Sequence, residues 1–60
     1  MTLLQALQPF TDSDLITVMC GLVVYTHKKS DLLKFVHLCG CELDYVEHLF
    51  NRTIFHVKEF

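Results

Sequence analysis

The stretch spanning residues 32–52 constrains the fold most, because its apolar residues recur at the three- and four-residue intervals of an amphipathic helix. The apolar positions before Gly40 are Leu32, Phe35, Val36 and Cys39, and those after it are Leu43, Val46, Leu49, Phe50, Ile54 and Val57. Gly40 is placed to adopt the left-handed conformation that commonly ends a helix. We therefore expect two short helices joined at Gly40, the second reaching about Lys58. The tail Thr53–Phe60 is also rich in residues favoured in strands, so a strand is the alternative there.

A short helical turn is expected at the N-terminus. Leu3, Leu4 and Leu7 share one helical face after Thr2. Pro9 ends this turn, because the residue before a proline avoids the helical conformation.

A longer helix is predicted from Asp12 to about Thr26. Thr11 and Asp14 have the spacing of a capping box, with Asp in place of Glu or Gln. After its first turn this helix would be apolar on nearly all sides, which is typical of a helix buried on most sides. The competing interpretation is a strand over Leu22–Thr26. The sequence as a whole thus predicts a single all-α domain of residues 1–60, with three main helices and the short N-terminal turn.

The apolar content is high for so short a chain. Hydrophobic residues make up 52% of the sequence, above the roughly 45–50% of an ordinary globular domain. A domain of this size buries only about 60% of the surface that its unfolded chain exposes. The surplus indicates a partner surface, most simply a second copy of the same chain. The residues expected at a homodimer interface are Ile16, Met19, Val23, Phe55 and Phe60.

The segment VHLCGCELDYVEHLFNR resembles the DNA-reading helix-turn-helix of the lac repressor family and related phage repressors. Val36 occupies the small-residue position of that motif, Gly40 the turn, and Cys41, Val46 and Leu49 the apolar positions. The resemblance covers about a third of the chain. It implies a reading helix whose base-facing residues are Leu43, Asp44 and His48, with Tyr45 and Glu47 near the DNA backbone and Arg52 near a phosphate.

The charges on this segment argue against DNA as the main ligand. The formal net charge of the whole chain is −2, and within this segment Glu42, Asp44 and Glu47 would repel phosphates. We therefore expect a small regulatory protein, of the kind found in phages and mobile elements, that contacts a protein partner, either a regulator or a nucleic-acid-binding protein. The residues expected to bind this partner are Glu42, Asp44, Tyr45, Glu47 and His48.

Two alternatives remain open from the sequence. The first is a DNA-binding transcriptional regulator, whose contacts would come from Lys28, Lys29, Lys34, Asp44, His48 and Arg52. The second is a pure oligomerisation module.

The sequence favours no catalytic function. It has no glycine-rich phosphate loop or oxyanion-hole motif, and a 60-residue domain has little room for a substrate pocket. Cys39 and Cys41 are expected to be buried structural thiols rather than metal ligands, in a reducing cytoplasm. We expect no enzyme activity, metal, cofactor or small-molecule substrate. The longest apolar run, Leu15 to Tyr25, is too short to span a bilayer, so we expect no membrane association.

Overall fold

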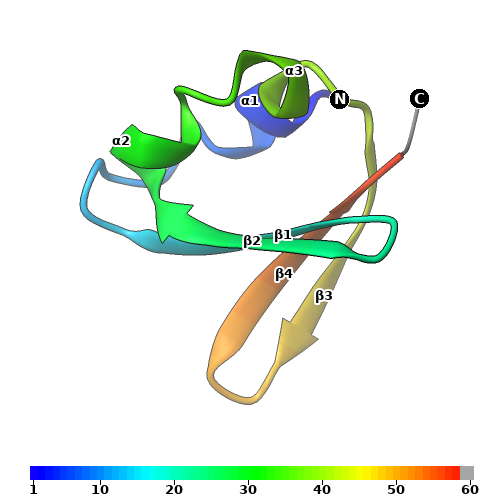
Figure 1. Cartoon of the computed structure of the whole chain (residues 1–60). Helices are drawn as coiled ribbons and strands as arrows, with labels where there is room; N and C mark the ends of the chain where they lie inside the picture. Colours follow the sequence, from blue (N-terminus) through cyan, green and yellow to red (C-terminus); the bar gives the residue numbers. More distant parts are fainter. Residues whose placement is uncertain (59–60) are drawn as a thin grey trace.

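A computed structural model describes residues 1–58, which form a four-stranded mixed sheet with three short helices on one side (Figure 1). In chain order the elements are α1 (Leu3–Ala6), β1 (Leu15–Cys20), β2 (Val23–Lys28), α2 (Lys29–Leu32), α3 (Val36–Cys39), β3 (Leu43–Leu49) and β4 (Arg52–Val57). The strand order is β2-β1-β4-β3. β1 and β4 are parallel neighbours at the centre, and each pairs antiparallel with an edge strand in a hairpin. The prediction of an all-α domain is therefore wrong, because strands dominate the described chain.

The segment predicted as a helix from Asp12 to Thr26 is instead largely the β1–β2 hairpin. Its two strands are joined by Gly21 and Leu22, and Gly21 has a φ of 61° whereas no non-glycine residue in residues 1–58 has a positive φ. A positive φ at only the first of two loop residues is the pattern of a type II′ turn, a favoured hairpin connection. The strands on either side are rich in β-branched residues, which pack well on a pleated surface. The strand alternative over Leu22–Thr26 was thus the better one.

The capping residues of that segment form a turn without a helix. The Thr11 amide donates to the Asp14 carboxylate at 2.9 Å, and the Asp14 amide donates to the Thr11 carbonyl at 3.1 Å. The chain then continues as β1, because a capping signal fixes one turn and not the residues that follow. The short N-terminal helical turn is confirmed as α1, and Thr2 and Gln5 close a capping box around it.

The predicted helix-turn-helix at Leu32–Arg52 is also wrong. Gly40 ends the four-residue α3 with a right-handed φ of −80°, and the chain then enters β3 instead of a second helix. A β-bulge explains the apolar spacing that suggested a helix after Gly40. A bulge between Leu43 and Tyr45 shifts the register, so inward-facing Leu43 and Val46 lie three residues apart instead of two. The β-prone tail forms β4 rather than a helix to Lys58.

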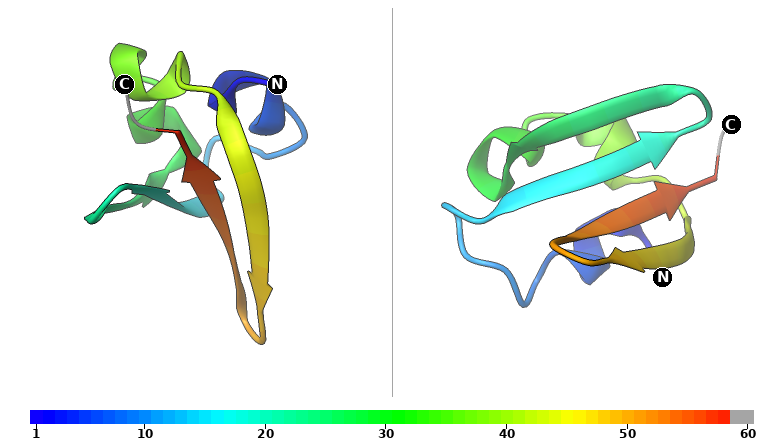
Figure 2. Two further views of the ribbon diagram at one scale, coloured as in Figure 1. Left: turned by 90° about the vertical axis from the view of Figure 1, so that its right-hand side faces the viewer. Right: turned by 90° about the horizontal axis from the view of Figure 1, so that it is seen from below.

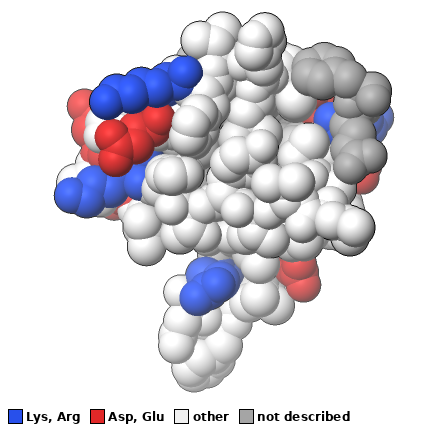
Figure 3. Space-filling model, in the orientation of Figure 1, with Lys and Arg blue, Asp and Glu red and all other residues white. Residues whose placement is uncertain are grey.

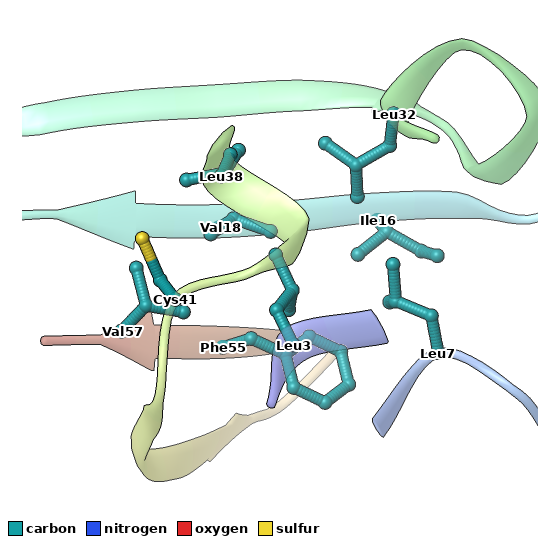
Figure 4. Packing of buried hydrophobic residues seen from close by; sticks show 9 residues of the cluster. All are labelled: Leu3, Leu7, Ile16, Val18, Leu32, Leu38, Cys41, Phe55 and Val57. Atoms are coloured by element: carbon teal, nitrogen blue, oxygen red, sulfur yellow. The ribbon is translucent and has the colours of Figure 1, made fainter. Parts of the chain in front are cut away.

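The core lies between one face of the sheet and the helical layer (Figure 4). The helical layer and the segments next to it contribute Leu3, Leu7, Leu32, Leu38 and Cys41, and the sheet contributes Ile16, Val18, Phe55 and Val57. The Phe10 ring packs edge-on against Phe55, with centroids 5.7 Å apart. Within residues 1–58, no helix has the length and apolar character needed to cross a membrane.

Candidate interaction surfaces

No segment within residues 1–58 covers the second face of the sheet (Figure 2). In the right-hand view of Figure 2, which shows the molecule from below, the strands lie in front of the helices. We call this surface the open face. The strand registers assign to it Leu15, Thr17, Met19, Val24, Thr26, Lys28, Tyr45, Glu47, Leu49, Arg52, Ile54 and His56.

The open face combines exposed apolar side chains with threonines and a few charged residues. Leu15 is 70% exposed, Val24 56% and Tyr45 54%, and none of these side chains contributes to the main buried cluster of residues 1–58. At the centre, Thr17 and Ile54 are almost buried by their neighbours on the same face. The result is a broad, mostly uncharged surface built on four strands.

One polar cluster fixes side chains on this face. The rings of Tyr45 and His56 stack in parallel, with centroids 4.2 Å apart and an interplanar angle of 9°. The Glu47 carboxylate lies 2.9 Å from Nε2 of His56 and accepts a hydrogen bond from it when that nitrogen is protonated. Because the three residues come from β3 and β4, these contacts hold the edge strand to the central one and restrict the rotamers of all three.

The five residues predicted to bind a protein partner lie on or beside the edge strand β3 rather than on a helix. Tyr45 and Glu47 reach the open face together. Asp44 lies in the bulge, and Glu42 pairs with the N-terminal amine at 3.2 Å. His48, which pairs with Thr53, is exposed on the other face of the sheet, away from the open face. The structure therefore brings two of the five onto one surface.

The cations predicted to contact DNA fall into two groups. Lys28, Lys29 and Lys34 belong to the end of β2 and the region of α2, where charged side chains gather in Figure 3. Lys29 Nζ donates to the Phe10 carbonyl at 2.8 Å, and Lys34 lies 3.7 Å from Asp31. Arg52 begins β4 on the open face. No DNA-reading helix brings these cations together, because the segment predicted to form that helix is the strand β3.

The residues predicted at a homodimer interface are also divided. Ile16 and Phe55 are only 2% and 5% exposed, so they belong to the monomer core and would not reach a second copy. Met19 lies on the open face, and Val23, at the start of β2, is 53% exposed. Phe60 lies outside the described residues.

The burial of Cys39 and Cys41 is confirmed. Cys39 Sγ donates to the Leu32 carbonyl and Cys41 Sγ to the His37 carbonyl, each at 3.4 Å. Burial is the main cause that raises the pKa of both thiols, which opposes thiolate formation and hence nucleophilic reactivity. Within residues 1–58, no group of three His, Cys, Asp or Glu side chains is arranged to hold a metal ion.

Sequence reasoning missed most of the open face. Leu15, Val24, Ile54 and His56 become neighbours only through strand pairing, which the helical interpretation did not contain. The available signal was Gly21-Leu22 between two β-branched runs, a favoured hairpin pattern. Comparison of the chain with protein-family models, curated proteins and solved structures finds no match in any of the three.

Proposed function

We propose that this protein acts by binding another protein through the open face. The observation behind this proposal is the one-sided covering of the sheet, which leaves Leu15, Val24 and Tyr45 more than half exposed on a single surface. Exposed apolar side chains gathered on one face of a monomer are typical of protein contact sites. The proposal keeps the protein-contact role expected from the sequence and moves it from an acidic helix to a sheet.

The charges of the open face indicate the chemistry of the partner. Glu47 already lies against His56, whereas Lys28 and Arg52 form no ion pair within residues 1–58. A matching partner surface would present apolar side chains to Leu15, Val24 and Tyr45 and carboxylates towards these two cations. Such charges at the rim favour encounter and register more than affinity.

Site-specific crosslinking tests where a partner binds. A photoreactive phenylalanine analogue replaces Tyr45 on the open face or, as the control, Leu4, which is 48% exposed on α1. After irradiation of nuclease-treated extract, we expect a protein adduct from position 45 and none from position 4. An adduct of equal yield at both positions would contradict the proposed surface.

The captured protein is then identified, purified and titrated with the complete chain. Arg52→Glu should slow association and weaken binding by roughly 5- to 30-fold, about 1–2 kcal/mol, because the reversed charge repels the partner's carboxylates. Leu4→Lys should leave the affinity unchanged. If binding instead requires nucleic acid and falls steeply with salt, the protein-binding proposal fails and the DNA-binding alternative gains support.

A further inference from the structure

The two edges of the sheet are protected very differently. The outer edge of β3 is occupied at its start by the N-terminal segment, because the Leu43 amide donates to the Met1 carbonyl at 2.8 Å and Thr2 bridges to Glu42. The bulge at Asp44 then disturbs the strand. A covered start, a bulge and charged side chains are the usual means by which proteins prevent a further strand from pairing.

The outer edge of β2 lacks a covered start and a bulge, and its one Lys, Lys28, stands at the very end of the strand. The strand pairs with β1 in unbroken register over six residues, and it contains no proline and no carboxylate. No backbone segment within residues 1–58 pairs with its other side. In the Gly21-Leu22 turn, the Val23 amide faces Cys20, so the backbone groups of Val24 and Thr26 point outward by alternation.

An apolar shelf, formed by Tyr25, Phe35 and Val36, lies beside this edge on the helical side. The Tyr25 and Phe35 rings have centroids 5.7 Å apart, and Val36 is 73% exposed. Together with Lys34, His37 and Leu38, these residues line a groove of about 430 Å³. A strand added to β2 would form main-chain hydrogen bonds along the edge and place alternate side chains on the shelf, which is the usual mode of strand addition.

We propose that the outer edge of β2 pairs antiparallel with β2 of a second copy of this chain, joining the two sheets into one. With Tyr25 on the two-fold axis, Val24 pairs with Thr26 of the other copy and Val23 with His27 of the other copy. Both pairs bring together residues of the same face, so the two open faces stay on one side and the two cores on the other.

The charge distribution favours this orientation. Figure 3 views the β2 side of the molecule, where charged side chains gather at the α2 end and the surface beside the rest of the strand is uncharged. Antiparallel pairing places the two cationic ends at opposite ends of the joined strands. A six-residue strand spans about 20 Å, which exceeds the screening length of about 8 Å at physiological salt. Parallel pairing would instead bring the two lysine clusters together.

Main-chain methylation tests this pairing without changing a side chain. The complete chain is prepared by chemical synthesis with an N-methyl group on the outward amide of Val24. The matched control has an N-methyl group on His48, whose amide points outward on the opposite edge by the same alternation. Mass in solution is measured by sedimentation from about 10 μM to about 500 μM, since dimerisation depends on concentration.

We expect the unmodified chain to reach twice its mass of 7.0 kDa, and N-methyl-Val24 to weaken the dimer at least about tenfold. N-methyl-His48 should dimerise normally. Val36→Lys, an exposed change on the shelf, should weaken the dimer too, and provides the test if the methylated strand fails to fold. A monomeric unmodified chain at the highest concentration, or equal weakening by both methylations, would overturn the proposal. Loss of dimerisation by Tyr45→Lys would also overturn it, because the open face would then be the dimer interface.

This inference is independent of the proposed partner. A protein captured at Tyr45 by a chain that stays monomeric would support the open face as a contact site and refute the β2 dimer. A chain that dimerises through β2 but captures no protein at Tyr45 would support the β2 dimer and refute the open face as a contact site.

Discussion

Replacing Gly21 by alanine should destabilise the protein, and the sign of the effect discriminates between a hairpin and a helix. Gly21 has a φ of 61° in the β1–β2 turn. Holding an L-residue at the first central position of a type II′ turn costs about 1–3 kcal/mol, offset by about 0.4–1 kcal/mol because alanine restricts the unfolded chain. The net loss should be about 1 kcal/mol. In the interior of a helix the same substitution would stabilise by about 1 kcal/mol.

Urea unfolding followed by circular dichroism measures this difference. With an m-value of about 1 kcal/mol/M, Gly21→Ala should lower the midpoint by about 1 M. Gly21→D-Ala should raise it, because a D-residue favours a positive φ. Gly40→Ala is the matched control: its φ is −80° and an added Cβ would meet only the carbonyl oxygens of Val36 and His37, at 3.6 Å. That variant should gain about 0.4–1 kcal/mol. A more stable Gly21→Ala variant would refute the turn assignment.

Two further predictions concern the core. Leu3→Ala should lower the unfolding free energy by about 2–5 kcal/mol because Leu3 is fully buried, whereas Leu4→Ala, on a half-exposed neighbour, should change it by less than about 0.5 kcal/mol; similar losses in chemical denaturation would contradict the orientation of α1. The raised pKa values of Cys39 and Cys41 predict an unfolding free energy that falls as pH rises above 9.0, the ordinary thiol value, because the unfolded state loses these protons first. The double variant Cys39→Ala, Cys41→Ala should lose less stability between pH 8 and pH 10, and an unchanged slope would exclude the two thiols as its cause.

Local signals in the sequence were informative where they concerned a single turn. The helical turn predicted after Thr2 is present as α1, and Thr11 and Asp14 do bond to each other. The fold class was wrong because hydrophobic spacing does not separate a helix from a strand that contains a bulge. Leu43 and Val46 face the same core only because an extra residue lies between them in β3. The open face was not predictable from such spacing, since Thr17 and Ile54 are neighbours through a pairing across most of the chain.

The parallel pairing of β1 with β4 has a consequence for how the molecule folds. Each hairpin is local, but a two-stranded hairpin by itself is at best marginally stable in water. Thr17 and Ile54 must meet across 54 − 17 = 37 positions before the sheet is complete, and closing such a loop costs about 3 kcal/mol of chain entropy. We therefore expect the pairing of β1 with β4 to be the step that limits the folding rate. We also expect that neither half of the chain folds alone and that the two halves gain their structure in one cooperative transition.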